Sequence, residues 1–299
     1  MTAAIETSGL TKRYGRRTAL SECSLSIPAG KVVGLVGPNG AGKTTLLHLS
    51  VGLLEPSAGR IEVLGHRPAE DAEQLARVGF VAQNTPLYAS MSVGDHLDLG
   101  AWLNPSWDES LARRRIEHLE LDMAQKAGTL SGGQRAQLAL TLAIAKRPEL
   151  LILDEPVASL DPLARRQFLQ ALMGTVTEHG VSVLLSSHLV ADLERVCDYL
   201  VVLVASRVQI AGDIDDLLST HHRLTGPRRD GLRPPSDWEV IAESATERQF
   251  TLVVRHESPV LDPGWTIDEL GLEDLVLAYM GRAATNGRGQ RQTLVGVPS

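Results

Sequence analysis

The residues that point most directly to chemistry form a glycine-rich loop at positions 37–44, GPNGAGKT, which fits the pattern G-x-x-x-x-G-K-[ST]. Its glycines allow successive backbone N–H groups to converge on phosphate oxygens, and the N-terminus of a following helix adds a favourable partial charge. Lys43 can reach the β- and γ-phosphates of a nucleotide, and the Thr44 hydroxyl can ligate Mg²⁺. The loop therefore predicts nucleotide binding. Many kinds of enzyme share such a loop, and a chance glycine-rich turn is the alternative.

Two adjacent carboxylates, Asp154 and Glu155, follow the apolar residues LLIL at 150–153. Such a run is typical of a buried strand, and α/β sheets bind ligands at the carboxyl ends of their strands. At that edge Asp154 is placed to hold the Mg²⁺ shell, and Glu155 to orient or deprotonate an attacking water. The alternative is a solvated turn after a buried strand, which the phosphate loop upstream disfavours.

A second glycine-rich stretch, LSGGQRAQLALTLAIA from residue 130, contains no obvious nucleophile or base. Ser131 is a plausible N-cap, and Gly132 and Gly133 open a helix with apolar residues at helical spacing. Glycine in a first turn costs stability, so the pair indicates that something approaches the backbone closely. Exposed N–H groups beside a serine hydroxyl form an anion site, which predicts a composite site closed by dimerisation around a nucleotide held by a second copy. A capped helix with a flexible lead is the alternative.

The elements that must position these residues alternate between short β-branched runs and helical patterns, which predicts an α/β core with a parallel sheet. The expected strands are apolar without a break and lie at 31–37, 78–83, 149–156 and 181–188. The expected helices lie at 42–54 and 161–176. From about 84 to 147 the pattern is largely helical, most clearly at 106–121, which predicts a helical subdomain inserted into the sheet.

The two ends of the chain carry different patterns. The first thirty residues predict antiparallel strands around the turn YGRRTA, and the segment HHRLTGPRRDGLRPPSDW at 221–238 predicts a linker or loop. A strand at 248–255, a helix at 268–282 and a disordered tail are expected after it. The expected division is a main domain at 1–220, a small C-terminal extension at 221–282, and the tail at 283–299.

Composition limits the classes of function. The formal net charge of −7 argues against a general nucleic-acid binder, whose footprint would be basic. The cysteines, Cys23 and Cys197, stand alone in the sequence, so neither zinc nor a disulfide framework is expected, and a reducing cytoplasm fits. No signal peptide is expected, and the longest apolar runs are far shorter than the roughly 20 residues that span a bilayer. Any membrane role would then depend on a partner.

The motifs together resemble the ATP-binding subunit of an ABC transporter over about residues 5–220. The phosphate loop, Gln83 after a strand, LSGGQ at 130–134, LLILDE at 150–155, SLD at 159–161 and His188 after a strand occur in that family's order and spacing. The resemblance implies an α/β P-loop NTPase with a RecA-like core, an N-terminal antiparallel β subdomain and an inserted helical subdomain. A small α+β extension would follow at the C-terminus.

The resemblance also implies roles that the residues alone do not give. Tyr14 matches the aromatic that stacks on adenine, with an ordinary hairpin tyrosine as the alternative. Gln83 matches a residue that contacts Mg²⁺ and the attacking water, although a solvated strand-end glutamine would look the same. His188 matches a switch histidine that hydrogen-bonds the γ-phosphate, against a merely structural histidine. Asp161 matches the dimer-communication loop, where many relatives carry a glycine before the leucine and this chain has ASLD.

The predicted site residues fall into four groups. The catalytic group is Glu155, His188, Gln83 and Lys43. The residues expected to bind ATP are Tyr14, Gly37, Pro38, Asn39, Gly40, Ala41, Gly42, Lys43, Thr44 and Thr45. Those expected to bind the nucleotide of a second copy are Ser131, Gly132, Gly133, Gln134 and Asp161. The expected ligands of Mg²⁺ are Thr44, Gln83 and Asp154.

The resemblance implies an ATPase that dimerises on ATP, as a homodimer or heterodimer, and drives a separate membrane permease from the cytoplasmic face of the membrane. The permease is expected to dock near 84–97, although a plain surface loop and helix is the alternative. The ending LEDLVLAYMG resembles the C-terminal helix of ATPases that serve exporters, which favours export over import.

Two other classes remain open. One is an ABC ATPase without a permease, acting in translation, DNA repair or chromosome organisation. The single phosphate loop disfavours a translation factor, and the two isolated cysteines disfavour a DNA-repair ATPase. The lack of long heptads disfavours a chromosome-organising ATPase. The other is an inactive regulatory subunit, which is disfavoured because Lys43, Asp154, Glu155 and His188 are all present.

Overall fold

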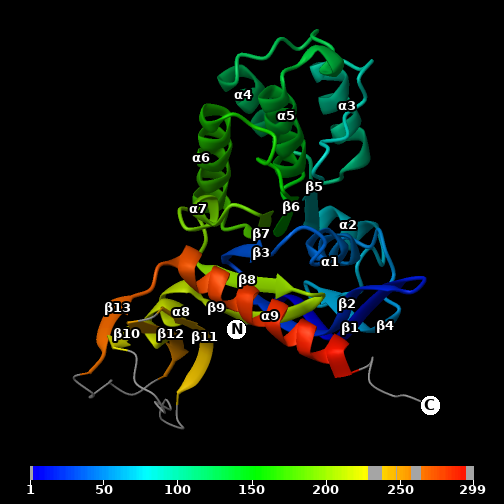
Figure 1. Cartoon of the computed structure of the whole chain (residues 1–299). Coiled ribbons are helices and arrows are strands. Elements are labelled where there is room, and N and C mark those ends of the chain that lie inside the picture. Colours follow the sequence, from blue (N-terminus) through cyan, green and yellow to red (C-terminus); the bar gives the residue numbers. More distant parts are fainter. Residues whose placement is uncertain (1–2, 228–237, 247, 257–263, 294–299) are drawn as a thin grey trace.

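The computed structural model describes residues 3–227, 238–246, 248–256 and 264–293, the last nine of these by their backbone alone. A six-stranded sheet lies at its centre (Figure 1). Its strands, in order across the sheet, are β5 (Val78–Val81), β6 (Leu150–Asp154), β7 (Ser182–Ser187), β3 (Val32–Val36), β8 (Tyr199–Val204) and β9 (Arg207–Asp213). All neighbours are parallel except β8 and β9, which are antiparallel. The four buried strands expected from the sequence are therefore present and parallel.

The sheet is buried on both faces, which explains why its strands are apolar without a break. Leu151 and Leu153 of β6 pack in one hydrophobic cluster with Phe168 of helix α6 (Pro162–His179). Their neighbours along β6 belong to a second cluster with Leu46 of helix α1 (Lys43–Ser50). The two helices thus cover opposite faces, and the carboxyl ends of the parallel strands share one edge of the sheet.

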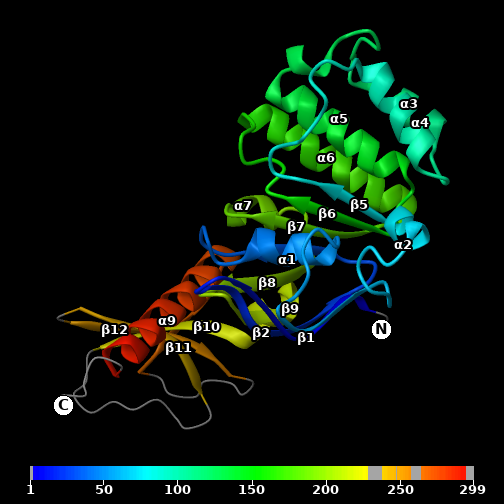
Figure 2. The ribbon, with the colours of Figure 1, turned by 90° about the vertical axis from the view of Figure 1, so that its right-hand side faces the viewer.

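Helices fill the long connection between β5 and β6. They are α3 (Val93–Leu103), α4 (Glu109–His118) and α5 (Gly132–Ala145), and they share a small core that includes Val93, Leu97, Ile116 and Leu138. In Figures 1 and 2 these helices stand beyond the sheet on the side where α6 extends. The short helix α2 (Ala72–Arg77) precedes β5.

The N-terminal part is an antiparallel sheet in the order β2-β1-β4, built from β1 (Ala3–Tyr14), β2 (Arg17–Pro28) and β4 (Ala58–Val63). Strands β1 and β2 form the hairpin expected around the turn YGRRTA. Residues of this sheet pack in the same hydrophobic cluster as α1, so the N-terminal sheet lies on the face of the central sheet that α1 covers.

The C-terminal part is a four-stranded antiparallel sheet in which β11 (Glu239–Ala245), β12 (Gln249–Arg255), β10 (His221–Pro227) and β13 (Thr266–Glu269) follow one another. Helix α8 (Ile214–Thr220) leads into it, and helix α9 (Leu272–Thr293) crosses beneath the central sheet (Figure 1). No helix of the described residues is both long enough and apolar enough to cross a bilayer.

Two expectations about this region were wrong. The start of the expected linker, 221–227, is the strand β10, which pairs with both β12 and β13; the remainder, 228–237, lies outside the described residues. Strand β10 is an inner strand paired on both edges, and His221, Leu224 and Gly226 are its buried residues, so HHRLTGP lacks the regular polar/apolar alternation of a half-exposed strand. The disordered tail expected from 283 is helical as far as Thr293, because α9 continues to that residue, and residues 294–299 lie outside the described residues.

A buried histidine joins the extension to α9. Nδ1 of His221 lies 2.7 Å from the carbonyl oxygen of Leu217, and Nε2 lies 2.9 Å from the hydroxyl of Tyr279. A carbonyl can only accept, so Nδ1 carries the hydrogen and Nε2 accepts from the tyrosine, which requires a neutral imidazole. Burial lowers the pKa of His221, and burial raises the pKa of Tyr279 to about 12.

This contact predicts a pH-dependent stability. Because the pKa of His221 is lower in the folded chain than the roughly 6.5 of a free histidine, the unfolded chain binds the extra proton first. The neutral His221 contributes its full stabilisation above the unfolded-state pKa of roughly 6.5. That contribution is lost as the pH falls from there through the lower pKa of the folded chain. We expect the melting temperature to fall by a few degrees between pH 7.5 and pH 5.5, and His221→Gln to reduce that difference. An equal fall in the variant would contradict the assignment.

Candidate functional site

The phosphate loop connects β3 to α1, as the sequence predicts. A Cβ atom at Gly37 would lie 2.0 Å from the carbonyl oxygen of Leu203, and one at Gly42 would lie 2.4 Å from that of Ala19. Gly42 also adopts φ = 112°, which disfavours any other residue. Packing requires glycine at both positions, and the backbone conformation also requires it at Gly42.

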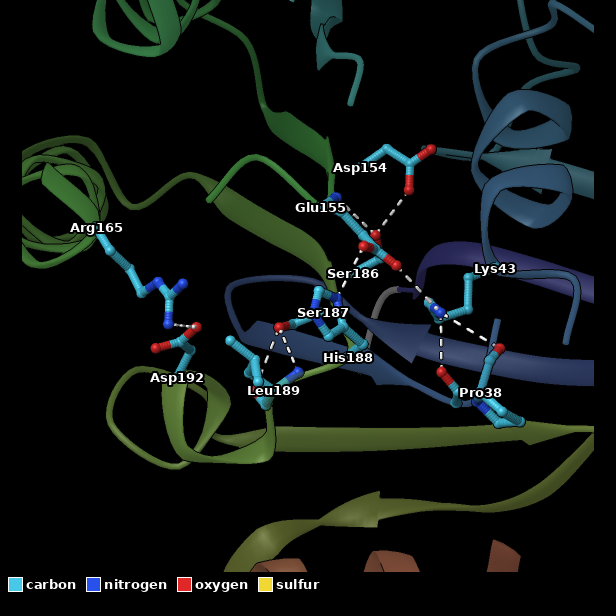
Figure 3. Close-up of polar contacts among 11 residues, drawn as sticks. Pro38, Lys43, Asp154, Glu155, Arg165, Ser186, Ser187, His188, Leu189 and Asp192 are labelled. Atoms are coloured by element: carbon cyan, nitrogen blue, oxygen red, sulfur yellow. Dashed lines mark hydrogen bonds and ion pairs between the residues drawn. The ribbon is translucent and has the colours of Figure 1, made fainter. Parts of the chain in front are cut away.

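Three of the predicted catalytic side chains lie together at the carboxyl edge of the sheet (Figure 3). Lys43 Nζ donates to the carbonyl oxygen of Gly37 at 2.8 Å and lies 3.2 Å from Glu155 Oε1. The other carboxylate oxygen of Glu155 lies 2.9 Å from His188 Nδ1. Because an ionised carboxylate only accepts, Nδ1 is the protonated nitrogen. Glu155 thus bridges a lysine from α1 and a histidine that follows β7.

Ser186 positions the carboxylate pair. Its hydroxyl donates to Asp154 Oδ1 at 2.8 Å and accepts from the backbone N–H of Glu155 at 2.9 Å. Glu155 has φ = 45°, a left-handed conformation that is uncommon for residues other than glycine. No pattern in the sequence pointed to Ser186, because a serine at the end of a strand has no distinctive spacing.

A cavity of about 530 Å³ lies over the phosphate loop. Most of the residues predicted to act on the nucleotide line it: Tyr14, Asn39, Gly40, Gly42, Lys43, Thr44, Thr45, Gln83, Glu155 and His188. Asp154 lies beneath it, with 1% of its surface exposed. Gly37, Pro38 and Ala41 belong to the loop but not to the cavity wall. The structure therefore brings these residues to one place from five separate parts of the chain.

Arg17 also lines this cavity and was missed by the sequence reasoning. It stands at the start of β2, and one of its guanidinium nitrogens lies 3.3 Å from where a Cβ of Gly40 would be. It adds a second positive charge to the cavity that Lys43 lines. An arginine in a hairpin of four basic residues, KRYGRR, could not be singled out by its position in the sequence.

A second cavity, of about 390 Å³, holds the other predicted group. Ser131, Gly132, Gly133 and Gln134 at the start of α5 line it together with Asp161 at the start of α6. None of these residues lines the cavity over the phosphate loop. Within the described chain the two sets of predicted nucleotide-binding residues thus occupy separate cavities.

The start of α5 is a capping box. The hydroxyl of Ser131 accepts from the backbone N–H of Gln134 at 3.2 Å, and the Gln134 side chain accepts from the N–H of Ser131 at 2.9 Å. A Cβ at Gly132 would meet nothing within 4 Å, so nothing in the described chain requires glycine there. At Gly133 it would lie 3.1 Å from the Cβ of Ala164 and 4.0 Å from the hydroxyl oxygen of Ser131. The capped helix of the alternative interpretation is therefore present. It does not explain Gly132, because no contact within the described chain requires a glycine there.

Asp161 has a clear structural task. It is the N-cap of α6, and its carboxylate accepts from the N–H groups of Leu163 and Ala164, both at 3.0 Å. Pro162 follows at the first position of the helix, where its missing N–H costs nothing. This capping fixes the aspartate at the rim of the second cavity.

The donor set fits a magnesium ion. Thr44 and Gln83 line the cavity over the phosphate loop, and Asp154 precedes Glu155, which also lines it. A hydroxyl, an amide oxygen and a carboxylate are oxygen donors, the class that Mg²⁺ prefers, and Mg²⁺ is usually held by one or two carboxylates together with substrate phosphates. The hydrogen bond from Ser186 to Asp154 orients that carboxylate, as supporting residues do in metal sites.

The third cavity is an apolar groove of about 610 Å³ between α1, β5 and the inserted helices. Residues from the segment after Gln83 line it, among them Pro86, Leu87 and Tyr88, as do Leu53 and Leu103. Tyr88, Leu53 and Leu103 expose 63%, 62% and 60% of their surface. Large exposed apolar residues around a groove mark an interaction surface.

Comparison with known proteins agrees with this geometry. The family model described as ABC transporter matches residues 20–158. A solved structure entitled "Structure of ATP binding subunit of ABC transporter" superposes with a TM-score of 0.65 at 29% identity, covering 72% of this chain and 92% of that chain. The expected fold class, a P-loop NTPase core with antiparallel sheets and an inserted helical part, is therefore confirmed.

Named relatives give the same result. The uncharacterized ABC transporter ATP-binding protein YcbN of Bacillus subtilis (strain 168) is 31% identical over 220 residues, 73% of this chain and 72% of that protein. The Nod factor export ATP-binding protein I of Rhizobium johnstonii is 37% identical over 212 residues, 68% and 67% of the two chains. A sulfate/thiosulfate import ATP-binding protein, CysA 1 of Agrobacterium fabrum, is 34% identical over 226 residues, 72% and 65%. This chain belongs to the ATP-binding proteins of ABC transporters.

Proposed function

We propose that this chain hydrolyses ATP, that two ATPase subunits close around the nucleotides, and that closure drives a separate membrane permease. One observation carries the proposal: the two predicted halves of the nucleotide site lie in separate cavities of the same chain. The cavity over the phosphate loop contains the charged side chains, whereas the cavity at Ser131 offers helix N-termini. Two copies arranged head to tail would complete both sites.

The chain's own residues account for hydrolysis as follows. Lys43 and the loop N–H groups hold the β- and γ-phosphates, and Tyr14, which is 47% exposed, stacks on the adenine. Glu155 orients and deprotonates the attacking water. The Nδ1–H of His188, which contacts Glu155 in this structure, would turn to donate to the γ-phosphate when that carboxylate binds the water. Mg²⁺ held by Thr44, Gln83 and Asp154 would neutralise charge on the phosphate oxygens. Ser131 and Gly133 of the second copy would contact the same γ-phosphate from the opposite side.

The apolar groove after Gln83 is the proposed permease dock. Its depth and apolar walls suit a short amphipathic helix, which would place its apolar face in the groove. Ala82 and Thr85, which flank Gln83 in the chain, line the groove, so a docked helix would contact the same segment that reaches the nucleotide cavity. This arrangement would place the chain on the cytoplasmic face of the membrane. Export is the proposed direction of transport, because the sequence of the C-terminal helix resembles that of ATPases that serve exporters.

Co-purification from membranes tests this function. Tyr88→Asp places a charge in the groove, and we expect at least about tenfold less membrane protein to co-purify with it than with the wild type. Leu277→Asp is the matched control, because Leu277 is similarly exposed (56%) but lies on α9, outside the groove. Equal recovery with both variants would refute the dock, and recovery of ribosomes or DNA in place of a permease would refute the transport function. A permease that acts without a separate binding protein would support export.

A further inference from the structure

A buried ion pair connects the helices that follow the two halves of the site. Arg165 lies one turn into α6, four residues after Asp161, and Asp192 lies in the short helix α7 (Val190–Leu193), four residues after His188. Arg165 Nη1 lies 3.7 Å from Asp192 Oδ2 (Figure 3). The side chains expose 26% and 8% of their surface, so the aspartate is almost fully removed from water.

This pair is electrostatically incomplete as it stands. Asp192 Oδ2 is buried and accepts no hydrogen bond within the described residues, and Arg165 Nε likewise donates none there. Arg165 Nη2 makes only a long contact, 3.4 Å, with the carbonyl oxygen of Leu160. Charge-assisted N–H···O bonds are about 2.7–2.9 Å long and about twice as strong as neutral ones. A movement of α6 toward α7 by about 1 Å would shorten the Arg165–Asp192 contact to that length, and the stronger ion pair would stabilise the new position.

Each end of the pair is firmly tied to one half of the site. On α6, the backbone N–H of Arg165 donates to the carbonyl oxygen of Asp161 at 2.9 Å, and Asp161 faces the cavity shared with Ser131. On the other side, the Ser187 hydroxyl accepts from the N–H of Leu189 at 3.0 Å, which fixes the turn between His188 and α7. One helical turn, about 5.4 Å, separates Arg165 from Asp161. On the other side, Asp192 lies in α7, which begins two residues after His188. Such short, hydrogen-bonded segments move as units.

We infer that Arg165 and Asp192 are positioning residues that couple the half-site facing a second copy to the catalytic His188 of their own chain. This inference rests on the proposed function. When a second copy engages Asp161, the start of α6 shifts and the ion pair shortens. Asp192 then holds α7, and with it His188, at the γ-phosphate. Neither residue lines the nucleotide cavity, so the pair acts on the hydrolytic step and not on ATP binding to one chain.

Steady-state kinetics of the full chain, with its permease, tests the coupling. Asp192→Asn and Arg165→Gln are each expected to lower kcat about tenfold and to leave KM for ATP and the ATP affinity of the monomer within about twofold. The exchange R165D/D192R restores the opposite charges and is expected to recover kcat to within about threefold of the wild type. Arg165→Lys, which keeps the charge, is expected to retain at least half of kcat. Arg166→Gln is the control, because Arg166 is the exposed neighbour of Arg165 on α6.

The possible outcomes separate this inference from the function on which it rests. A wild-type protein that does not hydrolyse ATP refutes the proposed function itself. Wild-type hydrolysis together with unchanged kcat in both single variants overturns the coupling alone. An equal loss of kcat in Arg165→Gln and Arg165→Lys also overturns the coupling. A loss that does not depend on the charge would mean that the arginine contributes by packing and not by its ion pair. If the exchange variant R165D/D192R does not fold, the comparison of Arg165→Gln with Arg165→Lys still decides between the two outcomes.

Discussion

Glu155→Gln is expected to abolish turnover while stabilising an ATP-bound dimer. The glutamine keeps the size of the side chain but cannot take a proton from water, so hydrolysis should fall by at least about 100-fold. It also removes the negative charge beside Lys43, 3.2 Å away, and so frees that ammonium for phosphate. ATP contacts made across the two copies would then persist, since the step that releases them is blocked.

Phosphate release and size-exclusion chromatography with saturating ATP measure both effects. Glu194→Gln is the control, because Glu194 is an exposed carboxylate just after α7 that lies outside the nucleotide cavity. Glu155→Gln that stays monomeric with saturating ATP and with the permease would show the composite site to be wrong. Residual hydrolysis near the wild-type rate would remove Glu155 from its catalytic role.

Ser131→Arg is expected to block hydrolysis and to leave the ATP affinity of the monomer within about twofold. Ser131 lines the cavity that contains Gly132 and Gly133, where a long side chain would fill the space meant for the phosphate of the second copy. The nucleotide cavity over the phosphate loop does not include Ser131, so binding to a single chain is unaffected. Nucleotide titration of the monomer and steady-state hydrolysis measure the two quantities.

The control must allow for the cap that Ser131 provides, worth about 1 kcal/mol of helix stability. Ser92 caps α3 with the same reciprocal arrangement, with Asp95 in place of Gln134, and it lies outside the second cavity. Ser92→Arg therefore removes an equivalent cap and is expected to keep hydrolysis. If Ser131→Arg also lowers the ATP affinity of the monomer strongly, the stretch acts on its own nucleotide and the assignment to a second copy fails.

Local patterns accounted for the parts of the fold that are local in the chain. The phosphate loop, the capped start of α5 and the apolar strands β3, β6 and β7 depend on residues next to one another, so their sequence determines them. The position of Asp154 at a carboxyl edge follows from the same reasoning, because a parallel sheet places those ends together. The strand β10 was missed because its burial comes from β12, β13 and α9, which are distant in the sequence.

By itself the sequence determined that this chain has a phosphate loop, a carboxylate pair after a buried strand and a second glycine-rich helix start, and through them its family. Only the tertiary structure decided which of these share a cavity. It placed Arg17 in the same cavity as Lys43, Ser186 in contact with both Asp154 and Glu155, and Asp161 with Ser131 in a cavity that the phosphate loop does not line. These are contacts between segments far apart in the chain, and neither spacing nor periodicity encodes them. They depend on how the sheet, the inserted helices and α6 pack on one another.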